Sequence, residues 1–375
     1  MNLEMETLYM MALTRVPRLN VINQRLAYEA LGSATALYEN RKDLKAFLPD
    51  ASPTLLDNLA RMDELIPRVE QELEWDISKR IQCLCLHDAR YPARLRECED
   101  APLVLYYLGN ADLNRAHIIN MVGTRQCTEY GKDICRHFLS DLSRLCPDTL
   151  VVSGLAYGVD INAHRNALEN GLNTVGVLAH GLDQIYPRLH RGTAQEMVSH
   201  GGLLTEYMSG TTPEKLNFVA RNRIVAGIAD ATVVVESAIK GGSLITAGLA
   251  VDYNRDVFAF PGRVGDPYSA GCNALINQSK AHLITSAQDM LDILGWKTHE
   301  DMNEQRKNGV QRELFVELTA EELAVVRALK GTDGKAMSQL SIETGMPIGK
   351  LSAILLTMEM KGVVKMMVGG MYRLL

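Results

Sequence analysis

The sequence predicts an α/β protein with a doubly wound, mainly parallel sheet, preceded by a small helical domain and followed by a winged-helix domain. Between about residues 76 and 296, short apolar runs alternate with helical patterns, and glycine-rich turns follow several of the runs. Near the C-terminus, two short helical patterns precede two apolar runs that are separated by a glycine pair. Apolar strands that alternate with helices are typical of βαβ units and of a parallel sheet covered on both faces.

Length and composition indicate a globular protein of two or three domains. The chain has 375 residues, 47% of them hydrophobic, and 39 Lys and Arg against 45 Asp and Glu give a net charge of −6. This charge argues against a protein that coats nucleic acid by bulk attraction, so a polyanion site would be a local basic pocket. No run of 18 apolar residues and no signal-peptide pattern is present, and we therefore expect a cytoplasmic protein.

The seven cysteines are scattered through the chain without a C-x-x-C pair. Since no nearby histidines complete a set of ligands, we expect no metal site and no cofactor. Buried free thiols in a reducing compartment account for these residues.

Residues 1–75 are predicted to form the helical domain. Apolar residues recur there with the helical period, and Gly32, Pro49 and Pro53 separate the patterns. The predicted helices are 3–13, 20–31, 34–38, 43–47 and 54–73.

Residues 76–296 are predicted to form the sheet and its covering helices. The predicted strands are 80–86, 103–107, 118–122, 150–152, 174–178, 203–205, 232–235, 257–259 and 282–284. The clearest helical patterns between them are 130–145, 160–169, 218–228 and 244–253.

Polar residues dominate the predicted linker, 297–316, and a winged helix is predicted over 317–375. Its helices are expected at 320–330, 338–344 and 348–361, and its hairpin turns at Gly369-Gly370. The last helix offers only Lys350 and Lys361 as cations, whereas a helix that reads DNA normally carries more donors. We therefore interpret this domain mainly as a packing or partner surface.

Three turns that follow predicted strands share one form. They contain Gly123-Thr124-Arg125, Ser153-Gly154 and Lys240-Gly241-Gly242-Ser243. Each could be an ordinary tight connection, but ligands of open α/β sheets bind at the carboxyl ends of the strands, where all three turns would lie. Backbone N–H groups and helix N-termini at such turns favour a phosphate.

The sequence contains no arrangement typical of catalysis beside these turns. It has no G-x-G-x-x-G within a βαβ unit, no phosphate-binding loop of the G-x-x-x-x-G-K-[ST] type and no G-x-S-x-G elbow. His164 is expected to be buried, and Asp160 is expected to cap the helix that it opens. We predict an anion-binding site without catalytic residues.

Cations and one aromatic residue precede the third turn. Arg221 and Arg223 diverge by roughly 200° around a helix, so one is expected to face the site while the other pairs with an acid such as Asp230 or Glu236. Lys215 and Phe218 lie three residues apart, on one face of a helix that begins early. A cation beside an exposed aromatic ring is typical of sites for single-stranded nucleic acid, although Phe218 could instead belong to the core.

Several segments together resemble the DNA-processing protein A family, also called DprA or Smf. They are VGTR at 122–125, SGLAYGVD at 153–160, RNRIVAG at 221–227, KGGSLITA at 240–247 and FPG at 260–262. The resemblance extends over about residues 80–295 and implies an extended Rossmann-like domain. It also implies that residues 1–75 resemble a SAM or helix-hairpin-helix module.

The resemblance implies a homodimeric single-stranded DNA-binding protein without enzymatic activity. Such proteins protect incoming DNA during natural transformation and load the RecA recombinase onto it. From the turns and the resemblance together, the expected DNA-binding residues are Gly123, Arg125, Ser153, Gly154, Lys215, Phe218, Arg221, Arg223, Lys240, Gly241, Gly242 and Ser243.

Two alternatives remain open at this point. A nucleotide phosphoribohydrolase on a related fold resembles P-G-G-x-G-T-x-x-E, but no Glu follows shortly after the stretch 240–247. A transcription regulator that reads duplex DNA through its winged helix is the other alternative, and the few basic residues there disfavour it.

Overall fold

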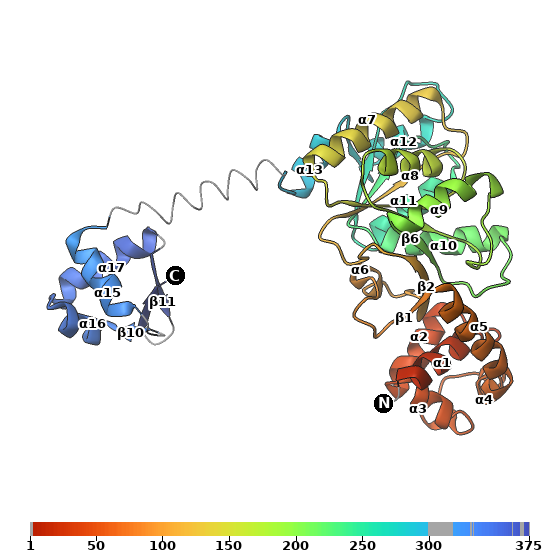
Figure 1. Ribbon diagram of the computed structural model, residues 1–375, viewed down its shortest axis with the longest axis horizontal. Helices are drawn as coiled ribbons and strands as arrows, with labels where there is room; N and C mark the ends of the chain where they lie inside the picture. The colour runs from red at the N-terminus through yellow and green to blue at the C-terminus, as the bar shows by residue number, and fades with distance from the viewer. Residues whose placement is uncertain are drawn as a thin grey trace. The chain divides into compact units, whose positions relative to one another are not determined.

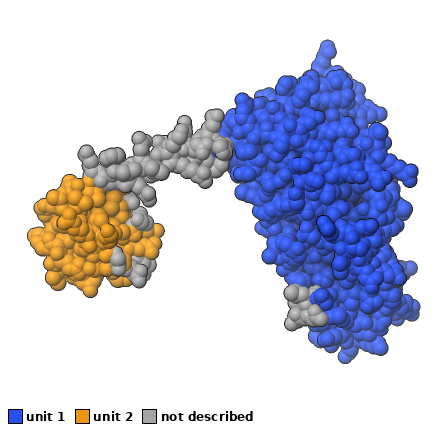
Figure 2. All heavy atoms as spheres, in the orientation of Figure 1, with its two compact units in different colours: residues 1–299 blue, residues 300–375 orange. Residues whose placement is uncertain are grey.

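The computed structural model describes residues 3–298, 318–330, 332, 334–361, 363–367 and 371–374. The chain divides into two compact units, residues 1–299 and 300–375, which are described separately (Figures 1 and 2). Most of the predicted linker 297–316 and the predicted turn at Gly369-Gly370 lie outside the described residues.

A nine-stranded sheet with the order β1-β2-β6-β5-β4-β3-β7-β8-β9 forms the centre of the larger unit. Its strands are β1 (Gln82–Cys85), β2 (Val104–Gly109), β3 (Ile118–Val122), β4 (Leu150–Ser153), β5 (Thr174–Val177), β6 (Gly201–Thr205), β7 (Ala231–Val234), β8 (Asp256–Ala259) and β9 (His282–Leu283). From β6 to β9 all neighbours run parallel, whereas β1 and β2 are antiparallel at one edge. The chain order reverses at β3, which confirms the predicted doubly wound, mainly parallel sheet.

Alternating residues of β3 show how both faces of the sheet are buried. Ile119 and Met121 belong to one hydrophobic cluster, and Ile118 and Val122 belong to another on the opposite face. Asn120 is the polar exception, and its buried amide donates to Val225 O at 3.1 Å and to Thr232 Oγ1 at 2.8 Å. Both hydrogen bonds satisfy the amide nitrogen, whereas Oδ1 has no partner among the described residues.

Helices cover the two faces of the sheet (Figure 1). The cluster around Ile119 includes residues of α7 (Glu129–Leu145), α8 (Val159–Glu169) and α13 (Ala287–Leu294). The cluster around Ile118 includes residues of α10 (Lys215–Gly227), α11 (Gly242–Asp252) and α12 (Ala270–Asn277). Two further short helices of this unit are α6 (Ala93–Arg96) and α9 (Arg191–Ser199). The prediction did not include α6, α9, α12 or α13.

The N-terminal helices share a hydrophobic core with the sheet. They are α1 (Leu3–Thr14), α2 (Val21–Leu31), α3 (Ala34–Glu39), α4 (Pro53–Ala60) and α5 (Ile66–Lys79), with 3-10 turns at Leu44–Ala46 and Met62–Leu65. The single predicted helix 54–73 is wrong, because the chain breaks after Ala60 and α5 starts anew with Pro67 in its first turn. The fully buried Glu6 accepts from Ala34 N at 2.7 Å and from Thr35 N at 2.9 Å, so it stabilises the start of α3.

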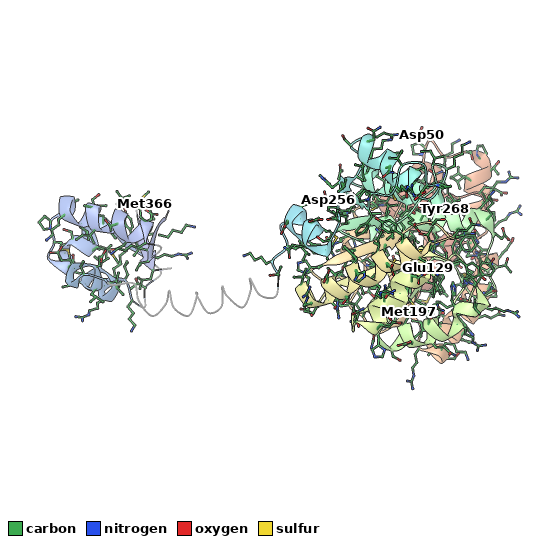
Figure 3. All side chains as sticks on the ribbon, turned by 90° about the horizontal axis from the view of Figure 1, so that it is seen from above. Asp50, Glu129, Met197, Asp256, Tyr268 and Met366 are labelled. Carbon is green, nitrogen blue, oxygen red and sulfur yellow. The ribbon has the colours of Figure 1, made fainter. Side chains whose placement is uncertain are left out.

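The described part of the smaller unit has the architecture predicted for a winged helix. It contains α15 (Ala320–Leu329), β10 (Lys335–Ala336), α16 (Met337–Thr344), α17 (Ile348–Met360), β11 (Val364–Met367) and β12 (Met371–Leu374). The strands form an antiparallel sheet of order β10-β12-β11 around a core that includes Val325, Leu340 and Leu355. Figure 3 marks Met366 on β11, a residue that is 54% exposed.

Two further expectations concern cysteines and membrane spans. All seven cysteines are free, as predicted, and all but Cys83 and Cys127 are buried. None of the helices in the described ranges is long and apolar enough to cross a bilayer.

Candidate nucleic-acid interface

A pocket of about 530 Å³ opens at the carboxyl edge of the sheet, where the chain order reverses. Its walls come from the turns after β3, β4 and β7, from one side of α10, from the start of α11 and from the segment between β5 and α9. The predicted site residues that line it are Gly123, Arg125, Gly154, Lys215, Phe218, Arg221, Gly241, Gly242 and Ser243. Residues far apart in the sequence therefore meet at the position that the strand topology favours for ligands.

The first two glycine turns hold each other in place. Val159 N, at the start of α8, donates to Thr124 O at 3.1 Å. Gly158 has φ 78°, and a Cβ there would lie 2.1 Å from Thr124 O. Only glycine permits this backbone conformation and this close approach. Gly158 therefore allows the turn after β4 to pack directly against the turn after β3.

Arg221 contributes a buried positive charge to the pocket wall. Only 4% of the residue is exposed, and Nη1 donates to Gly154 O at 2.7 Å and also to Val177 O. Burial lowers the pKa of the guanidinium, and the nearby Asp160 raises it. An arginine nevertheless stays protonated, so the wall behind the glycine turn is cationic.

Asp160 does not cap α8 as the sequence predicted. The cap position belongs to Gly158, and Asp160 Oδ2 accepts from Ala156 N at 3.2 Å, within the turn itself. Burial raises the pKa of this carboxyl group, while the Arg221 charge lowers it. Asp160 therefore stabilises the turn from inside.

Phe218 lies in the pocket and not in the core. Its half-buried ring has its centroid 5.4 Å from Arg125 Cζ and 5.9 Å from Arg221 Cζ. Tyr186 meets the same ring edge to face, with the centroids 5.9 Å apart. Cations within about 6 Å of an aromatic centroid are attracted by the ring's quadrupole, so the ring and the two guanidinium groups belong to one surface.

Two exposed cations complete this surface. Lys215 is the first residue of α10, and Arg125 lies in the turn after β3. Neither forms an ion pair with any carboxylate that the structure describes. Their charges are therefore available to an anion in the pocket.

The N-terminus of α11 points into the same pocket. The helix begins at Gly242, and its cap residue Gly241 provides no side-chain acceptor for the first amides. Ser243 Oγ donates to Ser237 Oγ at 2.8 Å, which stabilises the turn. The uncapped N–H groups and the helix dipole favour negative charge at this point.

Three of the predicted residues do not line the pocket. Ser153 is buried beneath it, with Oγ donating to Met121 O at 2.6 Å, and Lys240 is an exposed residue of the third turn. Arg223 is directed to the other side of α10, where its guanidinium forms a buried ion pair with Glu206. The 200° divergence from Arg221 was thus predicted, but the partner was not.

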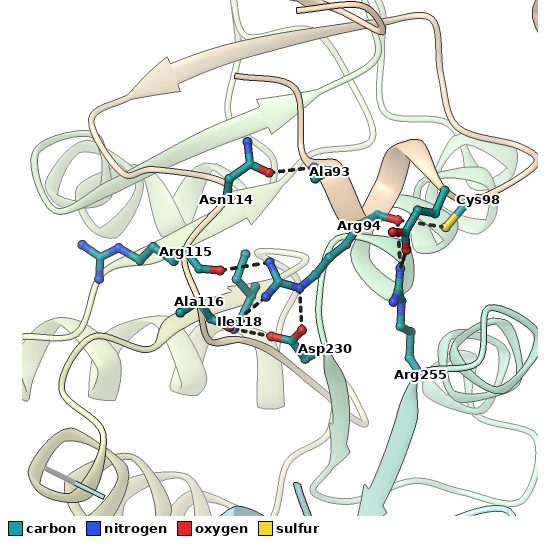
Figure 4. A network of polar contacts seen from close by, with 10 residues as sticks. Ala93, Arg94, Cys98, Asn114, Arg115, Ala116, Ile118, Asp230 and Arg255 are labelled. Atoms are coloured by element: carbon teal, nitrogen blue, oxygen red, sulfur yellow. Dashed lines mark hydrogen bonds and ion pairs between the residues drawn. The ribbon is translucent and has the colours of Figure 1, made fainter. Parts of the chain in front are cut away.

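Neither acid that was expected to pair with an arginine of α10 does so. Asp230 accepts from Arg94 Nε at 2.5 Å and from Ile118 N at 2.8 Å (Figure 4). Glu236 accepts from the backbone and hydroxyl of Thr128, at 2.9 and 2.5 Å, at the start of α7. Asp230 thus holds the start of β3, and Glu236 holds the cap residue of α7, so neither carboxylate is available to α10.

His164 is buried, as predicted, and its Nδ1 lies 2.7 Å from Thr174 Oγ1. Because Thr174 Oγ1 donates to Val151 O, the imidazole Nδ1–H must donate to this hydroxyl. Burial lowers the pKa of His164 to about 3, so the ring is neutral and structural at pH 7.

The sequence prediction missed several residues of the pocket wall. They include Thr124, Ala156, Tyr186, Pro213, Asn222 and Thr246. Tyr186 is 46% exposed and adjoins Phe218, but its segment lies 32 residues earlier, between β5 and α9. Its contact with Phe218 depends on the tertiary fold, so no local pattern could have found it.

Comparison with known proteins gives consistent matches. The family model of the DNA recombination-mediator protein A matches residues 82–295, and a DprA winged-helix model matches residues 316–370. The DNA processing protein DprA of Streptococcus pneumoniae is 41% identical over 204 residues, which are 54% of this chain and 71% of that protein. The Bacillus subtilis protein of the same name is 36% identical over 234 residues, 62% of this chain and 78% of its own length.

Two solved structures extend the comparison. The DNA processing protein A of Streptococcus pneumoniae superimposes with a TM-score of 0.65 at 32% identity, covering 75% of this chain and 95% of that one. A structure of the Helicobacter pylori protein, which concerns its single-stranded DNA binding mode, gives a TM-score of 0.52 at 30% identity, covering 57% of this chain and 95% of that one.

Proposed function

Because the chain belongs to the DNA recombination-mediator protein A family, we propose that its pocket binds single-stranded DNA with little sequence preference. The observation that carries this proposal is the surface formed by Arg125, Lys215 and Phe218, two cations without described acidic partners beside an accessible ring. Sites for single strands combine phosphate contacts with bases stacked on aromatic rings. The single-stranded DNA binding of the Helicobacter pylori relative supports the proposal.

Each group has its own role in this proposal. Arg125 and Lys215 contact phosphates, and Phe218 stacks on a base. The amides of Gly242 and Ser243, at the start of α11, donate to a phosphate oxygen. Arg221 stays in the wall and contributes its charge from behind the glycine turn.

Three predicted contacts are assigned differently. Ser153 supports the turn after β4 from below, and Lys240 attracts the strand from outside the pocket through its exposed charge. Arg223 holds the end of β6 through Glu206 in place of the phosphate contact expected from the sequence.

The wider role rests on the family. We infer that the protein acts in DNA processing during natural transformation, protects incoming single strands and loads a RecA-type recombinase onto them. In this account it is a cytoplasmic homodimer without enzymatic activity. In this proposal residues 76–296 bind the single-stranded DNA and residues 1–75 support that domain. Residues 317–375 provide a surface for a partner protein.

The geometry disfavours a nucleotide phosphoribohydrolase. Asp160 is the one carboxylate among the described residues that line the pocket, and it is buried with a hydrogen bond to Ala156 N. General acid–base catalysis requires a carboxyl group within reach of the substrate. Asp160 is engaged by Ala156 N and lies close to the buried Arg221 charge, so its carboxylate has a structural role in the turn.

The winged helix is not proposed as a reader of duplex DNA. Lys350 pairs with Glu321, and Lys361 Nζ lies 2.6 Å from Glu322 Oε1. Since both lysines of this helix are engaged by acids, few donors remain for a major groove.

A competition experiment tests the proposed function. Fluorescence anisotropy with a labelled oligothymidylate would be measured in the presence of unlabelled single strand, duplex or nucleoside monophosphate. We expect only the single strand to compete efficiently and no free base to be released from the monophosphates. Base release would support the hydrolase, and preferential competition by duplex would support the regulator. The mass in solution, with and without oligonucleotide, tests the dimer.

A further inference from the structure

We propose that α5, in the N-terminal helical segment, positions the strand-binding Lys215, with Glu72 and Arg68 as positioning residues. The inference rests on the proposed function, because it concerns how the phosphate-binding lysine is held. It gives the N-terminal segment a part in strand binding without any contact between that segment and DNA.

Glu72 attaches α5 to the connection between β6 and α10. Its carboxylate accepts from Ser209 N and from Ser209 Oγ, both at 2.5 Å, and the residue is only 1% exposed. A buried carboxylate is costly to leave without its donors. The contact therefore fixes Ser209 against α5.

Arg68, one turn earlier on α5, binds both Glu72 and the same serine. Its Nη2 lies 2.8 Å from Glu72 Oε2 and donates to Ser209 O at 2.7 Å. The N–H, hydroxyl and carbonyl groups of Ser209 are thus all bound by two side chains of one helix. Since charged groups form the stronger hydrogen bonds, Ser209 is held firmly.

The neighbouring residues of the connection are bound by a second segment. Gly210 N donates to Asp183 Oδ1 at 3.0 Å, and Gln184 Nε2 donates to Thr211 O at 3.0 Å. The segment that carries Asp183 and Gln184 continues directly to Tyr186, which lines the pocket. The connection is therefore held between α5 and a part of the pocket wall. We call the contacts of Glu72 and Arg68 with Ser209 the clamp.

The clamp matters because the connection itself has no regular structure. Residues 206–214 lie between β6 and α10 without helix or strand, and Gly210 has φ 80°. Pro213 and Lys215, which follow at once, both line the pocket. Thr211 makes backbone hydrogen bonds in this connection, accepting from Gly181 N at 3.2 Å and donating to Met208 O at 3.3 Å. Ser209 and Gly210 are held through side chains of Glu72, Arg68 and Asp183, so the α5 contact helps to set where the start of α10, and with it Lys215, lies.

Glu72→Gln tests the clamp in the full-length protein. The amide keeps the size of the side chain, but it loses the ion pair with Arg68 and one acceptor for Ser209. We expect the dissociation constant for an oligothymidylate of about 12 nucleotides to rise roughly three- to tenfold. In a Lys215→Ala background the same substitution should change the constant less than about twofold, because the group that is positioned has been removed.

Asp63→Asn is the matched control. Asp63 binds Arg41 and Tyr38 within the same helical segment and does not contact the connection. It tests whether any weakening of this segment reduces binding, and we expect affinity to stay within about twofold of the wild type.

The possible results separate the two proposals. If Lys215→Ala weakens binding and Glu72→Gln does not, the positioning role is wrong while the proposed function stands. The positioning role is also wrong if Glu72→Gln raises the dissociation constant as much in the Lys215→Ala background as in the wild type. It is equally wrong if Asp63→Asn raises the dissociation constant as much as Glu72→Gln does. If Lys215→Ala itself has no effect, the proposed function fails. If Glu72→Gln folds poorly, Ser209→Ala replaces it, because this substitution removes the hydroxyl that donates to Glu72. We expect Ser209→Ala also to raise the dissociation constant for the oligothymidylate.

Discussion

The guanidinium of Arg221 occupies the space in which a side chain at Gly154 would lie. A Cβ built on Gly154 would stand 2.6 Å from both Nη1 and Nη2 of Arg221, and Nη1 donates to Gly154 O at 2.7 Å. The glycine of the second turn and the buried cation therefore form one structural unit. The turn requires glycine here because an arginine is packed directly against it.

Gly154→Ala is expected to destabilise the protein by about 1–3 kcal/mol, because Arg221 must move from its buried carbonyl partners. It should also weaken strand binding. Gly242→Ala is the control, since a Cβ there meets nothing within 4 Å, and its effect on the free energy of unfolding should stay within about 0.5 kcal/mol. Urea denaturation measures both variants. Equal stabilities would mean that the Gly154–Arg221 contact is unimportant.

Asp76→Asn should change how stability depends on pH. Both carboxylate oxygens of Asp76 lack a described partner, and burial, with a smaller contribution from Glu72, raises the pKa from 3.8 to about 8. Between these values the folded protein binds a proton that the unfolded chain does not, so stability falls as the pH rises from about 4 to about 8. The variant should be more stable than the wild type at pH 8, by up to about 5 kcal/mol at roughly 1.4 kcal/mol for each pKa unit, and similar to it at pH 4. A pH-independent difference in melting temperature would contradict this.

Glu206→Gln tests whether Arg223 is structural. Removal of one partner from a buried ion pair costs about 3–5 kcal/mol, because the remaining charge stays buried. Thermal denaturation should show this loss, while the folded variant keeps its affinity for single strands within about twofold. If the variant binds single strands poorly but is as stable as the wild type, Arg223 is not structural and belongs to the binding site.

Phe218→Ala should remove a stacking contact and no phosphate contact. We expect a loss of about 1–3 kcal/mol in binding free energy with an unchanged salt dependence. Leu216→Ala is the control on the same helix, because Leu216 is 79% exposed and does not line the pocket. If Phe218→Ala binds as tightly as the control, the ring supports the pocket and does not stack on a base.

Apolar runs and glycine turns were sufficient to predict the sheet and the glycine turns that form part of the pocket wall. Strands that are buried on both faces are continuous apolar segments, so β3 to β8 could be located to within two residues. The helices α9 and α12 were missed because they are short and bury few apolar residues. A Ser286–Asp289 capping box forms the start of α13 and would have revealed this helix.

Hydrogen-bond and ion-pair partners that the tertiary fold brings together could not be predicted from the sequence. The spacing on α10 predicted that Arg221 and Arg223 point in different directions. That Arg223 pairs with Glu206 could not be predicted, because it depends on which strand end lies next to α10. In the same way, Asp160 had the sequence position of a helix cap, and the left-handed backbone at Gly158 moved its carboxylate into the preceding turn. Such contacts follow from tertiary packing and not from local pattern.

The salt dependence of binding shows whether cations of the pocket hold the single strand by its phosphates. On single strands, log K falls against log salt concentration with a slope of about −0.7 for each phosphate neutralised. The double variant Arg125→Ala with Lys215→Ala should bind more weakly than the wild type, with a slope less steep by about 1.4 for the two lost contacts. Unchanged affinity and slope in the double variant would show that the pocket is not the strand-binding site.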